Sequence, residues 1–367
     1  MNGEHRTRWP DVAALDETRT GAAPLVSGDE ERLRERLAAA VDAADAPDAV
    51  FALSRHGHRI VHSGGHRTAA TGREELRYEI GSASKTFTGL LLAELIRSGT
   101  LTGGEPASAF LAPGRATHTD GITLTHLITH TSGLPALPRD FLPRALPAWR
   151  TRPYARYPAE RVVEAFLRAR PRHRAGSRWH YSNFGVAVLG HALAAATGTS
   201  WEDLVTARVL DPLALHATAL RAGSPDTDAV GYTKDGRTLV AAFDPGGFQA
   251  AGAVRAAPHD LLTFLEAHLE PAGSALSDAL AAVRVPVLRR GLGHRHTHTL
   301  TWFRHPTDGG PMYFHSGATL GQQAFLGFRP DTGTALAAVC TRRFRSGDPF
   351  VATAYALLAG DEAEGEL

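Results

Sequence analysis

Hydrophobic residues recur with the period of a strand near both ends of the chain and with that of a helix in between. Residues 27–44 mix charged and apolar positions at helical spacing, which predicts an amphipathic helix. Two β-like runs in the segment 49–65 flank a short polar turn and predict a β-hairpin. Near the other end, three strands and a last helix are predicted, at 312–318, 324–329, 335–343 and 350–360.

The middle of the chain carries helical patterns. Residues 86–99 (TFTGLLLAELIRSG) are apolar on nearly every side, which is typical of a buried central helix. Three more helices are expected, over 183–198 with Gly198 as its stop, over 200–210 with Ser200 as its N-cap, and over 258–269 with Pro258 in its first turn. Strands at both ends therefore predict one sheet built from both termini, with a mainly helical subdomain inserted at about 100–225.

The length of 367 residues suits one large domain. We expect a single domain over 27–362 that includes the helical insertion. Residues 1–26 lack periodicity and are expected to form an N-terminal tail or strap, and residues 363–367 a C-terminal tail. The first residues are charged throughout and contain no apolar core of a signal peptide. We therefore expect a soluble, cytoplasmic protein.

Charge and cysteine content exclude several classes of protein. The net charge is +1, so no overall field draws the chain to nucleic acid or to a membrane, and neither is expected as a partner. The single cysteine, Cys340, excludes an internal disulfide. Ordinary proportions of hydrophobic (43%) and charged (21%) residues are typical of a soluble globular protein.

A lone lysine in the stretch GSASKTFTG is the first candidate for chemistry. The chain has 39 basic residues, and only Lys85 and Lys234 are lysines. On a helix, Ser82 and Lys85 would lie on one face. A serine hydroxyl needs a neighbour that takes its proton, which a desolvated lysine amine can do and an arginine cannot. The spacing therefore indicates a serine nucleophile, with a chance pairing as the alternative.

Tyr181 and Asn183, in RWHYSNFG, form the second candidate group. A phenol close to a lysine ammonium can have a lowered pKa and act as a general base. Asn183 could hold both the lysine and a substrate amide oxygen. The alternative is a helix N-cap with an aromatic residue beside it.

The third group is His315-Ser316-Gly317-Ala318, on a predicted strand. A glycine among small residues on an edge strand allows a substrate backbone to approach. A backbone N–H of this strand could join that of Ser82 in an oxyanion hole. A strand that ends in a glycine-containing turn is the alternative reading.

Together the three motifs resemble those of the serine β-lactamase and penicillin-binding-protein superfamily. The branch most similar holds class C β-lactamases, DD-peptidases, D-aminopeptidases, esterases and a few acyltransferases. The stretches ITLTHLITHTSGLP, GTSWEDLVTARVLDPLAL and HSGATLGQQAFLGFRPDTG are similar to segments of this branch, so the resemblance runs from about residue 30 to 360. It implies an α/β, β-lactamase-like fold, with an antiparallel sheet from both chain ends flanked by helices.

The resemblance also implies roles for these residues. Ser82 would be the acylated nucleophile, Lys85 would assist proton transfer, and Tyr181 would be the general base and the donor to the leaving group. Asn183 and the strand residues would bind substrate, with the backbone N–H groups of Ser82 and Ala318 as the oxyanion hole. No cofactor or metal is implied.

The expected function is hydrolysis of an ester or amide of a small metabolite through an acyl-serine intermediate. An acyltransferase of a biosynthetic pathway that uses the same acyl-enzyme is one alternative, and a catalytically silent ligand-binding or sensor protein is another. His315 stands where β-lactamases usually carry lysine, which favours an esterase or amidase over a true β-lactamase.

Two further features carry weaker expectations. His294, His296 and His298 would share one face of a strand and could bind zinc, although a solvated strand face is the simpler interpretation. Residues 136–180 contain eleven arginines against three acids. These arginines could surround the substrate cleft and select an anionic acyl substrate, or they could simply be solvated.

Overall fold

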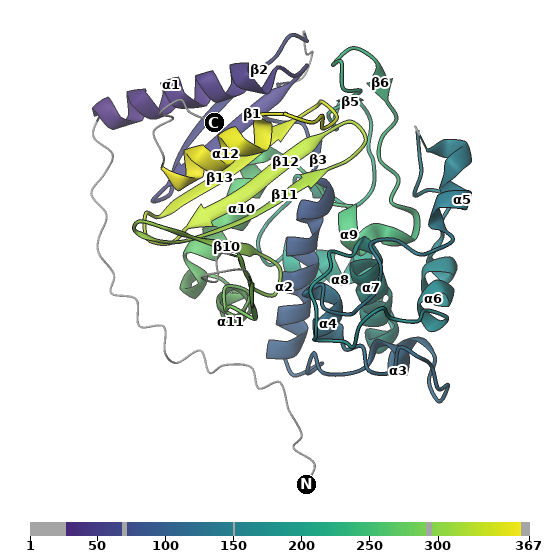
Figure 1. The fold of residues 1–367 in the computed structure, drawn as a ribbon. Helices are drawn as coiled ribbons and strands as arrows, with labels where there is room; N and C mark the ends of the chain where they lie inside the picture. The colour runs from purple at the N-terminus through teal and green to yellow at the C-terminus, as the bar shows by residue number, and fades with distance from the viewer. Residues whose placement is uncertain (1–26, 68–71, 150, 291–295, 361–367) are drawn as a thin grey trace.

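An eight-stranded antiparallel sheet forms the frame of the molecule, in the order β2-β1-β13-β12-β11-β10-β9-β8 (Figure 1). The computed structural model describes residues 27–67, 72–149, 151–290 and 296–360. The strands are β1 (Ala49–Arg55), β2 (His58–Gly64), β8 (Leu288–Arg290), β9 (His296–His298), β10 (Phe303–Thr307), β11 (Gly310–Ala318), β12 (Gln323–Arg329) and β13 (Thr334–Cys340). Because β1 pairs with β13, the sheet joins the two ends of the described chain.

Helices cover both faces of this sheet, so its central strands are buried on both sides. Helices α1 (Ser27–Ala44) and α12 (Phe350–Ala359) pack on one face, and α10 (Pro258–Leu269) packs on the other (Figure 1). Side chains of β1 alternate between the two layers, as a strand requires. Phe51 and Leu53 join the core under α1 and α12, whereas Val50 and Ala52 join the core that contains α10.

A mainly helical part lies beside the sheet and surrounds α2 (Ser84–Arg97) (Figure 1). It contains α3 (Ala107–Leu111), α4 (Leu124–Ile128), α5 (Phe141–Ala145), α6 (Ala159–Leu167), α7 (Asn183–Thr197), α8 (Trp201–Val205) and α9 (Gln249–Gly252), and α11 (Ser277–Ala282) packs on α2. Helix α2 is buried along nearly its whole length because it is apolar on all sides. Small two- and three-stranded sheets are formed by β3 (Tyr78–Glu79), β4 (Thr218–Ala219), β5 (Gly231–Tyr232), β6 (Leu239–Val240) and β7 (Arg255–Ala256).

The predicted fold class is confirmed, together with the N-terminal hairpin and the sheet built from both ends. The helix predicted over 200–210 differs, because α8 ends at Val205 and a π-helix continues over Thr206–Leu210. The strand predicted over 335–343 ends at Cys340, and beyond it Arg342 forms an isolated bridge with Tyr232, whose carbonyl accepts the N–H of Arg343. The predicted tails, 1–26 and 363–367, lie outside the described residues.

Candidate functional site

Ser82 lies at the point where the large sheet meets the central helix. It is the middle residue of a single 3₁₀ turn, Gly81–Ala83, which runs directly into α2. The spacing of three residues places Lys85 one turn further on, and its Nζ lies 3.0 Å from Ser82 Oγ. The predicted nucleophile and its lysine are therefore in direct contact.

Lys85 is fully enclosed by protein. Its side chain is 1% exposed, and its Nζ also donates to the carbonyl of Ala251 at 3.0 Å. Burial penalises the ammonium form and lowers the pKa of Lys85 to about 7. The other lysine, Lys234, is exposed on the loop between β5 and β6. Lys85 is thus an amine that can exchange its proton near neutral pH. This agrees with the expectation from the sequence, in which a lysine is kept although nearly all other basic residues are arginines.

Tyr181 faces the same amine. Lys85 Nζ lies 5.0 Å from the centre of the phenol ring. Burial raises the pKa of Tyr181 to about 12, and a hydrogen bond with Ser82 opposes the rise. We expected a lowered phenol pKa, and the structure gives the opposite direction because the ring is buried. Near neutral pH the phenol keeps its proton, so Lys85 is the more suitable proton acceptor of the two.

Asn183 is the first residue of α7 and lines the cavity in front of Ser82. Its side chain hydrogen bonds the phenol of Tyr154. Its Oδ1 is buried and has no hydrogen-bond partner among the described residues. The predicted role of Asn183, which is to hold a substrate amide oxygen, stays a prediction.

The end of β11 lies directly against the turn of Ser82. A Cβ on Gly317 would come within 1.9 Å of the Ile80 carbonyl oxygen and 2.8 Å of the Ser82 nitrogen. Gly81 has φ +50°, and a Cβ there would lie 2.5 Å from the Ala318 carbonyl oxygen. Glycine is therefore required on both sides of this contact. It brings the Ser82 and Ala318 backbones together, and their role as an oxyanion hole stays a prediction.

Of the four predicted residues on this strand, only Ala318 lines the cavity in front of Ser82. Ser316 points to the opposite face of β11 from His315 and Gly317. His315 is 3% exposed and lies in the interior beside Lys85, with its Nδ1 2.8 Å from the Ser316 carbonyl. Burial, followed by the nearby Lys85 charge, lowers the pKa of His315 to about 3. His315 is therefore neutral throughout the range from mild acid to pH 8.

The catalytic pocket, as we call the cavity in front of Ser82, has a volume of about 190 Å³. Its aromatic wall consists of Tyr154, Phe243 and Phe248. The remaining lining residues are Gly81, Ser82, Asn183, Ala251, Gly252, Ala318, Thr319 and Leu320. None of these described residues carries a formal charge. None of the described arginines in 136–180 lines this pocket, and selection of an anionic substrate by these arginines stays a prediction.

His130 was not predicted as a site residue, although it lies in the quoted stretch ITLTHLITHTSGLP. Its φ is +58°, an uncommon conformation for a residue with a Cβ. Its Nδ1 accepts the N–H of Ser182 at 3.2 Å, and its carbonyl accepts the N–H of His180 at 2.8 Å. The imidazole also packs on Tyr181, with 4.4 Å between ring centres. His130 therefore fixes the backbone on both sides of Tyr181.

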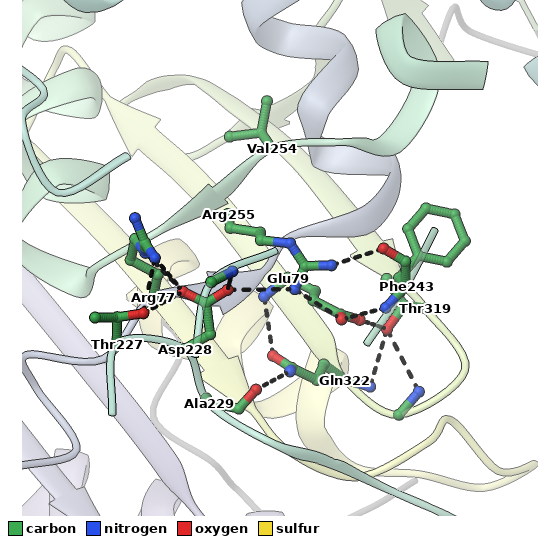
Figure 2. A network of polar contacts seen from close by, with 12 residues as sticks. Arg77, Glu79, Thr227, Asp228, Ala229, Phe243, Val254, Arg255, Thr319 and Gln322 are labelled. Atoms are coloured by element: carbon green, nitrogen blue, oxygen red, sulfur yellow. Dashed lines mark hydrogen bonds and ion pairs between the residues drawn. The ribbon is translucent and has the colours of Figure 1, made fainter. Parts of the chain in front are cut away.

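Glu79 was also missed, and it anchors two walls of the catalytic pocket (Figure 2). Its carboxylate is 5% exposed. It accepts the N–H of Phe243 at 2.7 Å, Arg255 Nη1 at 2.9 Å and the hydroxyl of Thr319 at 2.5 Å. Both Phe243 and Thr319 line the pocket. Their positions therefore depend on one buried carboxylate three residues before Ser82.

Asp228 continues this network away from the pocket. It pairs with Arg77 at 2.6 Å and lies 3.8 Å from Arg255 (Figure 2). Gln322 also takes part, since its side chain accepts the N–H of Glu79 and donates to the Ala229 carbonyl. The segment between β11 and β12 is thus tied to β3 and β7.

Metal binding by the three predicted histidines is not tested. His294 and the side chain of His296 lie outside what the structure describes, and the His298 ring stacks on Trp179 with 5.1 Å between centres. In the described part of the chain, no group of three or more histidine, cysteine, aspartate or glutamate side chains is arranged to hold a metal ion. No helix among the described residues is long and apolar enough to span a membrane.

Comparison with known proteins points to one family. The model of the family described as beta-lactamase matches residues 33–361. The chain is 26% identical over 322 residues to a beta-lactamase of Pseudomonas fluorescens, which is 78% of this chain and 85% of that protein. It is 34% identical over 152 residues to the D-alanyl-D-alanine-carboxypeptidase/endopeptidase AmpH of Escherichia coli (strain K12), which is 40% of this chain and 37% of that protein. A solved class C beta-lactamase shares the fold, with a TM-score of 0.78, 20% identity, and 93% and 99% of the two chains covered.

Proposed function

Because this chain belongs to the beta-lactamase family and is a serine hydrolase of that family, we propose that it cleaves an uncharged ester or amide of a small metabolite. The observation that carries this proposal is the catalytic pocket, which is small, partly aromatic and lined by described residues without formal charge. The carboxylate of a penicillin would find no cationic partner there. His315 does not supply one, because burial holds its pKa at about 3.

The reaction begins with neutral Lys85, whose amine lies 3.0 Å from Ser82 Oγ. Ser82 Oγ attacks the carbonyl carbon while its proton passes to Lys85 Nζ. The developing oxyanion accepts hydrogen bonds from the N–H groups of Ser82 and Ala318. Tyr181 donates its phenol proton to the leaving group as the bond to the acyl carbon breaks, and the proton held by Lys85 Nζ then returns to the phenolate, so that Lys85 is neutral again. Water then attacks the acyl-Ser82 ester and gives a proton to Lys85, which passes it to Ser82 Oγ as the acid is released. An amine or alcohol in place of water would give acyl transfer.

The pH profile tests the role of Lys85. Since the amine must be neutral to accept a proton and its pKa is about 7, kcat/KM for a neutral ester should rise about tenfold per pH unit below 7 and level off above it. Tyr181, with a pKa of about 12, should cause no fall before pH 9. The pKa values of His315 and His130 are both lowered, so neither should add a step near pH 7. Initial rates across pH 5 to 9 provide the measurement.

Lys85→Arg is the matched variant for this profile. It keeps the positive charge and loses the releasable proton, so the rate should drop by about a thousandfold and its rise near pH 7 should vanish. A Lys85→Arg enzyme that kept the rise near pH 7 would instead assign the base to another group.

The substrate class is tested by comparing a p-nitrophenyl ester with a penicillin. We expect kcat/KM for the neutral ester to exceed that for the penicillin by about a hundredfold or more at pH 8, because desolvating an unpaired carboxylate in an uncharged pocket is costly. Adding a primary amine would divert the acyl group if transfer competes with hydrolysis, and mass analysis of the products would show it. Rapid penicillin turnover at pH 8 would make a true beta-lactamase the better assignment.

A further inference from the structure

A second and larger cavity lies beside α6. Its volume is about 420 Å³, and it is lined by the 135–140 segment, α6 and the 168–172 segment. Five arginines line it: Arg139, Arg161, Arg168, Arg170 and Arg172. It shares no lining residue with the catalytic pocket. We call it the arginine cavity.

The cavity holds more positive charge than its own carboxylates neutralise. Asp140 and Glu164 are the two acids that line it. Arg161 bonds both of them, at 3.1 Å to Asp140 and 2.5 Å to Glu164. Asp140 also accepts the phenol of Tyr157 at 2.6 Å, and Glu164 pairs with Arg168 at 2.5 Å. The acids are therefore already engaged by neighbours.

Three arginines remain without such partners. Arg139, Arg170 and Arg172 form no ion pair with a carboxylate of the described residues, and all three are exposed. Like charges in one cavity repel unless an anion binds between them. Arginine is suited to this because its planar guanidinium bonds a carboxylate or phosphate through two N–H groups.

The remaining lining is apolar. Pro135, Pro138, Ala165, Ala169 and Phe184 complete the cavity, and Phe184 is 1% exposed. A binding site of this composition favours a ligand with an anionic head and an apolar body. Arginines that were only solvated at the surface would not require an apolar lining beneath them.

We propose that the arginine cavity is a second, non-catalytic site for a small organic anion that carries a phosphate or carboxylate on an apolar body. The anion is held by Arg139, Arg170 and Arg172, and its body rests on Phe184 and the prolines. The site goes beyond the proposed hydrolase activity, because it lies apart from Ser82 and its lining contains none of the catalytic residues.

Calorimetric titration with phenyl phosphate and with inorganic phosphate, at matched low ionic strength, tests the proposal. We expect phenyl phosphate to bind more tightly than inorganic phosphate, and 0.5 M salt to weaken both. The double variant Arg170→Ala/Arg172→Ala should raise the Kd by about tenfold or more, since it removes two of the charge-assisted contacts. The control Arg115→Ala/Arg174→Ala removes two exposed arginines outside the cavity and should leave the Kd within about twofold.

Titrations on Ser82→Ala separate this proposal from the catalytic one. The Ser82→Ala variant should bind phenyl phosphate as tightly as the unmodified protein does. In the unmodified enzyme, saturating phenyl phosphate should leave the KM for a neutral ester unchanged. Competition with the ester would place the anion in the catalytic pocket and overturn the second site. Binding that is absent, unaffected by the double variant, or no tighter for phenyl phosphate than for phosphate would also overturn it.

Discussion

Ser82→Ala is expected to abolish ester turnover, with a loss of about 10⁴-fold or more, while the protein stays folded. The hydroxyl that contacts Lys85 is the nucleophile in the proposed reaction, and no nearby group replaces it. Intact-mass analysis with a fluorophosphonate should show one covalent adduct on the unmodified protein and none on this variant. Circular dichroism would verify that both have the same fold.

Ser84→Ala is the matched control, because Ser84 is two residues away, at the start of α2. Its hydroxyl is buried and accepts the N–H of Val254 at 3.1 Å, so its role is structural. This variant should keep the adduct and most of the activity and lose about 1 kcal/mol of stability. An adduct that survives in Ser82→Ala and disappears in Ser84→Ala would refute the assignment of the nucleophile.

The part of the site that could be predicted from sequence is the part encoded by local spacing. Ser82 and Lys85 are three residues apart at the start of a helix, which is enough to bring their side chains together. Asn183 is the first residue of α7, and Ser182 before it is the N-cap, because its hydroxyl accepts the N–H of Gly185. Contacts of this kind depend on a few neighbouring residues, so they can be predicted without knowing the rest of the fold.

Residues that act through distant partners gave no such signal. Glu79 meets Arg255 and Thr319 across separations of 176 and 240 residues. The burial that changes the pKa of Tyr181 and His315 likewise comes from the whole surrounding structure. Local spacing cannot predict either property. It also cannot separate the two cavities, since Asn183 and Phe184 are adjacent in the chain and line different ones.

The fold shows the same limit. Strands β1, β12 and β13 were predictable because their apolar residues are continuous or alternate over seven positions. Strand β10 has the sequence FRHPT, in which an arginine, a histidine and a proline interrupt the hydrophobic pattern of a strand. Its pairing with β11 is set by tertiary contact and not by its own pattern.

The second large effect is expected at Glu79, whose carboxylate connects the chemistry to the pocket walls. Glu79→Ala removes the acceptor of the Phe243 N–H and the Thr319 hydroxyl together (Figure 2). Thr319 follows Ala318, whose N–H belongs to the predicted oxyanion hole. We therefore expect kcat/KM for a neutral ester to fall about a hundredfold, mostly through kcat, because the lost contacts position groups that act in the transition state.

Glu79→Ala also leaves Arg255, which is 3% exposed, without its closest carboxylate. Breaking a buried pair from one side costs about 3–5 kcal/mol of stability, which a urea titration would measure. The partial attraction of Asp228 at 3.8 Å should keep the loss near the lower end of this range. Kinetics are therefore best measured at low temperature, where the variant remains folded.

Glu79→Gln separates position from charge. Glutamine has the same shape and can still accept from Phe243 and bond Thr319, but it carries no charge for Arg255. It should lose stability much as alanine does and yet keep kcat within about tenfold of the unmodified enzyme. Combining it with Arg255→Met should recover part of the stability, since no unpaired charge then stays buried. If Glu79→Ala, shown to be folded, turned over the ester at the unmodified rate, Glu79 would have no part in positioning the site and its role would be structural alone.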